Sequence, residues 1–441
     1  MKVLFISLGC DKNLVDSEYM VGKLSDHQFE ITDEEADADV IVINTCCFIQ
    51  DAKEESIQTI LDMAAYRTAG SCMALIVCGC LAERYRQEIL TEIPEVDAVL
   101  GTNSTEHVLL AVEKVLAGNK YEAFEPLEHL EDHLAPRSIS TGGHYAHLKI
   151  AEGCDKRCTY CIIPSIRGPY RSVPMEKLIA EARSLADQGV KELILVAQET
   201  TLYGVDLYGK KSLHLLLNEL NRIPGLYWIR LMYCYPEEIY DELVEAIRDN
   251  EKVCHYIDMP IQHISTPVLK RMGRRTNRET LLEKISALRT AIPDIALRTT
   301  LICGFPGETA EQHEELMEFI NETEFDRLGA FAYSQEENTP AAEYPDQVEE
   351  AEKEAWKDEV MKLQEEIIQD KNGDMIGREL DIMIGGKVAD EDAYVGRSYR
   401  DAPDIDGYVF VRTGEELATG DFVRVKIIGA YEYDLIGDLM M

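Results

Sequence analysis

Three cysteines in one short segment constrain this chain more than any other feature of its sequence. Cys154, Cys158 and Cys161 follow Gly153 in the string GCDKRCTYC, directly after an apolar run that is typical of a strand. Intervals of four and three residues allow one loop to fold three thiolates around one metal centre, and soft thiolates select iron–sulfur clusters or zinc. A cubane cluster of four irons with three cysteine ligands would keep one iron open for a substrate or cofactor. The sequence therefore predicts a metal centre with an open position.

A structural zinc ion is the alternative for the same three thiolates. Structural zinc needs a fourth protein ligand, and His144 or His147 could supply it. Three unrelated buried cysteines at this spacing are a weaker interpretation. The iron–sulfur cluster is favoured, and zinc stays open.

A second group of cysteines is spread through the first hundred residues. Cys10, Cys46 and Cys80 each come two residues after a strand-like run, the three runs being 3–8, 40–44 and 74–78. Parallel strands place the following loops on one edge of a sheet, where open α/β folds bind ligands. A single buried cysteine is most often a core residue, but the equal offsets predict a second metal site. Cys47 and Cys78 are weaker candidates.

Alternating strand-like and helix-like segments predict an α/β class with three domains. Residues 1–136 indicate a parallel α/β domain, and an acidic connector ends it. Residues 140–372 repeat a strand and a helix six times, which predicts a partial (β/α)6 barrel with its chemistry at the carboxyl ends of the strands. A charged helix over 349–369 closes this domain. Residues 375–441, with short glycine-punctuated strands, predict a small all-β barrel.

The cellular compartment of the protein decides whether its twelve cysteines stay reduced. The first residues, MKVLFISLGC, lack the long apolar run and small-residue cleavage site of a signal peptide. The longest apolar run, 72–82, is too short to span a bilayer. We therefore expect a cytoplasmic protein without membrane contact, in which the thiols stay reduced.

The charge of the chain restricts its partners. The chain has 44 Lys and Arg and 82 Asp and Glu, which gives a formal net charge of −38. Residues 375–441 alone contain 7 Lys and Arg and 14 Asp and Glu. Such a surface repels a phosphate backbone, so no direct grip on nucleic acid is expected. A basic protein is the partner that the charge favours, although acidic surfaces also serve solubility alone.

The cysteine triplet resembles the cluster-binding motif of the radical S-adenosylmethionine (SAM) superfamily. The resemblance implies a 4Fe-4S cluster on Cys154, Cys158 and Cys161, whose open iron is chelated by SAM. Reduction would then cleave SAM to a 5′-deoxyadenosyl radical. This chemistry suits an unactivated C–H bond, while the protein holds the substrate dry and close.

Longer strings are similar to the methylthiotransferase family, and the likeness covers essentially the whole chain. They are LGCDKNLVDSE, NTCCFI, CGCLAER, KIAEGCDKRCTYCIIPSIRGPYRSVP and TTLICGFPGET. The resemblance implies a second 4Fe-4S cluster on Cys10, Cys46 and Cys80, a methyl group from a second SAM, and a C-terminal domain like the TRAM module. Cys47 stands where the family usually has glycine, and we keep Cys46 as the ligand.

Four further strings, SLGCDKNLVDSE, AQETTLYGVDLYG, IRLMYCYP and YIDMPIQHIS, resemble one branch of this family. That branch methylthiolates the β-carbon of an aspartate in a small-subunit ribosomal protein, the twelfth in the standard naming. The implied partners are this basic protein and an electron donor. A tRNA-adenosine methylthiotransferase and a non-catalytic iron–sulfur carrier or scaffold are the alternatives.

The sequence identifies only some of the residues that would bind SAM. Tyr160, next to Cys161, is an aromatic residue placed to touch adenine. Gln198 and Gly304 stand at predicted strand ends, at the mouth of the barrel, and Gly304 would let backbone approach the cofactor closely. No catalytic side chain is assigned.

Overall fold

The computed structural model describes residues 1–131 and 137–440, which form two compact units. The first unit comprises Met1–Ser140, Ala151–Val173 and Ser334–Ala342, and the second comprises Thr141–Ile150, Pro174–Tyr333 and Glu343–Met441. The predicted domain end at residue 136 lies outside the described residues. The division into three domains stays a prediction about sequence modules.

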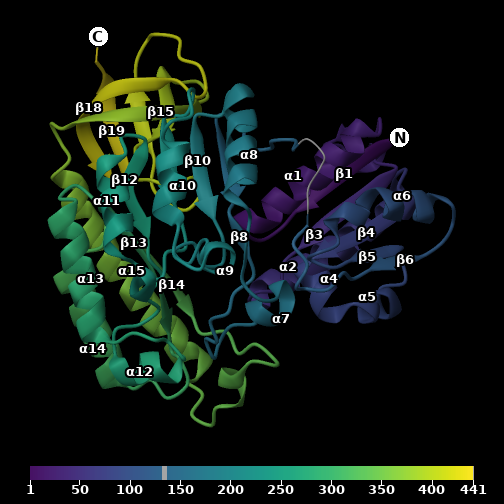
Figure 1. The fold of residues 1–441 in the computed structure, drawn as a ribbon, viewed down its shortest axis with the longest axis horizontal. Coiled ribbons are helices and arrows are strands. Elements are labelled where there is room, and N and C mark those ends of the chain that lie inside the picture. Colours follow the sequence, from purple (N-terminus) through teal and green to yellow (C-terminus); the bar gives the residue numbers. More distant parts are fainter. Residues whose placement is uncertain (132–136, 441) are drawn as a thin grey trace. The chain divides into compact units, whose positions relative to one another are not determined.

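A six-stranded parallel sheet forms the centre of the first unit, in the order β2-β1-β3-β4-β5-β6 (Figure 1). The strands are β1 Lys2–Ser7, β2 Glu30–Thr32, β3 Val40–Thr45, β4 Ala74–Gly79, β5 Ala98–Leu100 and β6 Tyr121–Ala123. The predicted parallel α/β domain is confirmed. Strands β2, β5 and β6 were not predicted, because three residues are too few to show a periodic pattern.

Helices cover both faces of this sheet. They are α1 Asp11–Asp26, α2 Gln50–Ala64, α3 Tyr66–Ala69, α4 Cys80–Tyr85, α5 Gln87–Glu92 and α6 Val108–Leu116, with short 3₁₀ turns η1 Glu35–Asp37 and η2 Thr105–His107. Val40 and Val42 of β3 pack with α1 and α6, whereas Ile41 and Ile43 pack with α2, α4 and α5. Because both faces are buried, the central strands are continuously apolar rather than alternating.

The cysteine-rich segment belongs to the first unit. It begins in β8 Ala151–Glu152, continues through α7 Ile163–Arg167 and ends in β9 Arg171–Ser172, which pairs antiparallel with β8. Ile162 and Ile166 join the apolar core formed by β3, β4 and α4. The predicted domain 140–372 includes this segment, whose apolar residues pack against the first sheet.

The second unit contains another six-stranded parallel sheet, in the order β14-β13-β12-β11-β10-β7. Figure 1 labels β10, β12, β13 and β14 of this sheet. Its strands are β7 Tyr145–Lys149, β10 Glu192–Val196, β11 Trp228–Leu231, β12 Val253–Asp258, β13 Ala296–Cys303 and β14 Arg327–Ala332. Its helices are α8 Met175–Asp187, α9 Val205–Tyr208, α10 Leu213–Leu220, η3 Pro236–Glu238, α11 Asp241–Asp249, α12 Thr266–Arg271, α13 Arg278–Ala291, α14 Ala310–Thr323 and α15 Glu350–Gly373. A further 3₁₀ turn, η4 Pro340–Glu343, precedes α15. The sheet is open between β14 and β7, so the predicted partial barrel is confirmed.

The C-terminal part of the second unit is a closed five-stranded barrel in the order β15-β16-β17-β19-β18. Its strands are β15 Glu379–Lys387, β16 Ala393–Arg397, β17 Val409–Arg412, β18 Phe422–Tyr431 and β19 Asp434–Leu439. The sequence predicted the barrel and three of these strands. Strands β16 and β19 were not predicted, because each has at most six residues and one of these is a glycine, which leaves few side chains for a pattern.

Among the described residues, no helix has the length and the apolar character needed to cross a membrane.

Candidate iron–sulfur sites

The cysteines predicted as a second ligand set lie at the carboxyl edge of the first sheet. Strands β1, β3 and β4 are parallel neighbours, so the segments that follow them leave the sheet at the same edge. Cys10 is the N-cap residue of α1, Cys46 follows β3 directly, and Cys80 is the first residue of α4. The strands end at Ser7, Thr45 and Gly79. The equal offsets expected from the sequence are therefore wrong, whereas the common edge is confirmed by the strand order.

Two glycines shape the turns that hold these cysteines. Gly9 and Gly79 both have φ of +89°, a region that side chains other than glycine rarely adopt. A Cβ on Gly9 would lie 2.8 Å from Cys46 Sγ, and a Cβ on Gly79 would overlap Asn44 Oδ1. Glycine is therefore needed where the Cys46 side chain rests against the turn that leads to Cys10.

The thiols of this set influence one another. Burial raises the pKa of Cys46; a backbone hydrogen bond from Phe48 opposes this effect, and the neighbouring Cys10 adds to it. Burial also raises the pKa of Cys80; Arg167 lowers it, and Cys46 and Cys10 raise it further. A positively charged metal centre would offset both burial and mutual repulsion, so buried soft donors at one edge fit an iron–sulfur cluster.

The two weaker candidates lie in the apolar core. Cys47 is fully buried among the side chains of α2, α4 and the facing strands, and burial raises the pKa of its thiol to about 12. Cys78 points to the other face of the sheet, toward α1 and α6. Cys46, by contrast, rests against the Gly9 turn. These positions favour Cys46 over Cys47 as a ligand.

The cysteine triplet lies in the loop between β8 and α7. Cys154 and Cys158 are 6% exposed and Cys161 is partly exposed. The Cys154 N–H donates to Gly168 O at 3.1 Å, and the Cys161 N–H donates to Cys158 O at 3.1 Å. Gly153 has φ of +79°, and a Cβ there would overlap the carbonyl oxygen of Pro169. The loop is thus closed on itself by backbone contacts, with glycine again preceding the first cysteine.

Within residues 1–131 and 137–440, no three His, Cys, Asp or Glu side chains stand as a ready set for one metal ion. His144 and His147, the zinc alternatives, lie in the second unit beside Tyr145, with ring centroids 5.0 and 5.9 Å from its ring. Burial lowers the pKa of His144. The ligand sets and the zinc alternative therefore stay predictions.

The predicted SAM-binding residues occupy both units. Tyr160 lies in the cysteine loop of the first unit and is partly exposed. Gln198 follows β10 and Gly304 follows β13, so both stand at the carboxyl edge of the second sheet. Gly304 has φ of +73°, and a Cβ there would overlap the side chain of Lys353 from α15. The packing of α15 is therefore a structural reason for this glycine, beside its predicted role.

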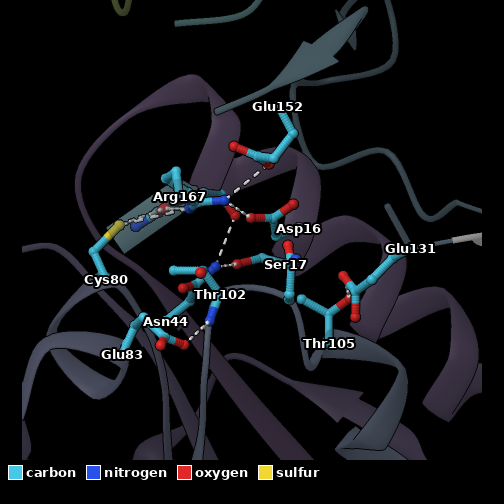
Figure 2. A network of polar contacts seen from close by, with 12 residues as sticks. Asp16, Ser17, Asn44, Cys80, Glu83, Thr102, Thr105, Glu131, Glu152 and Arg167 are labelled. Atoms are coloured by element: carbon cyan, nitrogen blue, oxygen red, sulfur yellow. Dashed lines mark hydrogen bonds and ion pairs between the residues drawn. The ribbon is translucent and has the colours of Figure 1, made fainter. Parts of the chain in front are cut away.

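A buried arginine connects the two cysteine regions, and the sequence analysis did not single it out. Figure 2 shows Arg167, from the end of α7, at the centre of a polar network with Asp16 of α1 and Glu152 of β8. Its guanidinium also reaches Cys80 Sγ at 3.6 Å. The only sequence signal was its place within the family-like string PSIRGPYRS, because its partners lie up to 154 residues away.

The fold and the cysteine loop define a class of protein. The model of the radical SAM superfamily matches residues 148–320, that of the uncharacterized protein family UPF0004 matches residues 2–101, and that of the TRAM domain matches residues 376–440. Among solved structures, the radical SAM methyltransferase TsrM from Kitasatospora setae has a TM-score of 0.56 at 15% identity, covering 77% of this chain and 76% of its own. OxsB, a cobalamin-dependent SAM radical enzyme, has a TM-score of 0.53 at 14% identity, covering 82% and 56%. At such identities the likeness shows the fold, which is that of the radical SAM enzymes.

Sequence relatives narrow the class to one family. The ribosomal protein uS12 methylthiotransferase RimO of Lachnoclostridium phytofermentans is 58% identical over 437 residues, covering 99% of both chains. The protein of the same name from Clostridium perfringens is 50% identical over 438 residues, covering 99% of this chain and 97% of its own. This chain belongs to the RimO family of methylthiotransferases.

Proposed function

We propose that this chain transfers a methylthio group to the β-carbon of an aspartate in ribosomal protein uS12. The observation that carries the proposal is the 58% identity with a uS12 methylthiotransferase along 99% of both chains. The two cysteine sets support it, because sulfur insertion at an unactivated carbon requires both radical chemistry and a source of sulfur.

Two 4Fe-4S clusters and SAM are the proposed cofactors. Cys154, Cys158 and Cys161 would hold the cluster that binds SAM, with Tyr160, Gln198 and Gly304 as further SAM contacts, and Cys10, Cys46 and Cys80 would hold the second cluster. When bound, these groups would supply the one-electron chemistry that removes a hydrogen atom and the sulfur that replaces it. The chain itself contributes thiolates on backbone-closed loops, buried from water at Cys46, Cys80, Cys154 and Cys158.

The proposed partners follow from the same chemistry and from charge. Reductive cleavage of SAM needs a one-electron donor, and such chemistry with reduced thiols suits the cytoplasm. A chain with a formal net charge of −38 favours a basic ribosomal protein over a nucleic acid as its partner.

Mass spectrometry of small-subunit ribosomal proteins, with and without this gene, tests the proposal. We expect an added methylthio group on one uS12 aspartate that disappears when the gene is deleted. A methylthio group that is lost from tRNA adenosine instead would favour the tRNA enzyme. Failure of the reconstituted protein to bind SAM would favour the iron–sulfur carrier.

The two cysteine sets can be separated by their products. Replacing Cys154, Cys158 or Cys161 with Ala should abolish both deoxyadenosine and methylthio product, since SAM chelation is lost. Cys10→Ala, Cys46→Ala or Cys80→Ala should leave deoxyadenosine measurable while the methylthio product disappears. A reductant-driven assay that quantifies both products decides between these outcomes, with circular dichroism as the folding control. Full methylthiolation by Cys80→Ala would contradict the assignment.

A further inference from the structure

Arg167 is a charged residue that is buried inside the first unit. It is 2% exposed and is among the largest fully buried side chains of the described chain. It ends α7, six residues after Cys161, yet its guanidinium reaches the carboxyl edge of the first sheet. A buried cation is costly unless every side of it is paired, so its partners indicate what it is built to contact.

Two carboxylates and one amide hold the guanidinium in place. Arg167 donates to Asp16 at 2.8 Å, to Glu152 at 3.1 Å and to Asn13 Oδ1. All three partners are at most 3% exposed. Because the guanidinium is a rigid planar fork, these contacts fix its orientation, and Nη2, which donates to Asn13, also donates to Cys80 Sγ at 3.6 Å (Figure 2).

Asn13 extends the same network to the turns of the other two cysteines. Its side-chain amide donates to Leu8 O at 2.9 Å and to Thr45 O at 3.0 Å. Leu8 lies two residues before Cys10, and Thr45 lies directly before Cys46. One buried network therefore touches the segments that carry all three cysteines of the set.

We propose that Arg167 is a positioning residue for the second cluster: it donates a charge-assisted N–H···S hydrogen bond to Cys80 and raises the reduction potential of the cluster that Cys80 binds. The inference rests on the proposed second cluster on Cys10, Cys46 and Cys80. One-electron reduction makes an iron–sulfur cluster more negative, so a buried cationic donor at a ligand sulfur stabilises the reduced state. Hydrogen bonds to the sulfurs and net charge are known to set such potentials.

The test isolates the second cluster. In a parent with Cys154, Cys158 and Cys161 all replaced by Ala, anaerobic reconstitution should yield about four irons, one cubane. The cluster is titrated with dithionite and redox mediators, and its reduction is followed by electron paramagnetic resonance. Arg167→Gln should lower the ratio of reduced to oxidised clusters about tenfold at the midpoint potential of the parent, which is a shift of about 59 mV for a one-electron couple.

Two further variants separate the hydrogen bond from buried charge in general. Arg171 is 8% exposed in the same segment, and its guanidinium donates to the carbonyls of Arg167 and Pro169 and to the Asn103 amide oxygen. Arg171→Gln should shift the reduced fraction less than about twofold, since the cation is lost but the hydrogen bond stays. Arg167→Lys, which keeps the charge and loses the fork, should fall between the parent and Arg167→Gln.

Unchanged potential in an Arg167→Gln protein that holds its iron would overturn the inference, as would an equal shift in Arg171→Gln. If Arg167→Gln does not fold, a variant with Asp16→Asn and Arg167→Met removes the cation together with one carboxylate, so the net charge is unchanged and Glu152 keeps the Gly153 N–H. That variant should also lower the ratio of reduced to oxidised clusters, because the hydrogen bond to the sulfur is lost, and an unchanged potential in it overturns the inference. A parent without iron would refute the second cluster itself, a result distinct from any effect of Arg167.

Discussion

Buried charges in the second unit are paired by residues from distant parts of the chain. Glu192, the first residue of β10, is fully buried between Arg230 of β11 and Arg397 of β16, each at 2.7 Å. Burial alone would raise the pKa of Glu192, but Arg397 and Arg230 outweigh it and lower the pKa from 4.5 to about 2. This carboxylate therefore links the partial barrel to the C-terminal barrel within one compact unit.

The pH dependence of stability tests this ion group. Because the pKa of Glu192 is depressed in the folded state, its contribution is present above about pH 4.5 and is lost as the pH falls toward 2. We expect Glu192→Gln to lower the free energy of unfolding by about 3 kcal/mol at neutral pH, and the difference from the native chain to shrink in acid. Urea unfolding followed by circular dichroism at several pH values measures it.

Glu219→Gln is the matched control, because Glu219 of α10 pairs with Arg222 in the turn that follows, and both side chains are exposed. Such a pair contributes less than about 1 kcal/mol. A difference for Glu192→Gln that stays constant down to pH 2 would contradict the pairing described here.

At the scale of elements, glycine-cysteine turns recur at both predicted cluster sites. Gly9, Gly79 and Gly153 have positive φ and directly precede Cys10, Cys80 and Cys154. Gly79 has φ of 89° and ψ of −152°, a region that is essentially restricted to glycine. These turns reverse the chain at the end of a strand without placing a Cβ in the space that neighbouring backbone or side chains occupy.

Gly79→Ala should displace Cys80 and release the second cluster. The new Cβ would be strained at this φ and would overlap Asn44 Oδ1. We expect iron to fall from about eight to about four per chain after reconstitution, while deoxyadenosine formation continues. Gly118→Ala is the control, because Gly118 has φ of +82° but a Cβ there meets no atom within 4 Å. Equal iron loss in both variants would indicate strain in general rather than displacement of Cys80.

At the scale of the whole molecule, charge is the dominant feature. The formal net charge of −38 gives a long-range attraction for a basic protein. Exposed charges separated by more than about 8 Å are largely screened at physiological ionic strength.

Binding of uS12 should therefore weaken as salt is added, through slower association. Titration of uS12 at a series of salt concentrations, beside a tRNA control, measures this effect. Tight tRNA binding together with salt-insensitive uS12 binding would contradict the proposed substrate.

Local sequence patterns were sufficient to predict much of this protein. The alternation of the apolar runs at β1, β3 and β4 with helix-like segments predicted a parallel sheet, because a helix that connects two strands returns the chain to the same end of the sheet. The spacing of Cys154, Cys158 and Cys161 predicted a ligand loop, because three nearby thiols need no tertiary contact to be recognised. Strands of three residues, and short strands that contain a glycine, were not predicted, since they have too few side chains to show a periodic pattern.

Only the tertiary structure decided which distant residues meet. The sequence predicted that Cys10, Cys46 and Cys80 share one edge of the sheet, but the structure decided where each strand ends, and the three cysteines are not equally spaced from those ends. Core packing of Ile162 and Ile166 assigns the cysteine loop to the first unit. The most distant partners of Arg167 and Glu192 lie 154 and 205 residues away. Sequence periodicity reports which face of an element is buried, whereas the partner of a buried charge depends on how the chain crosses itself, and no local pattern records that crossing.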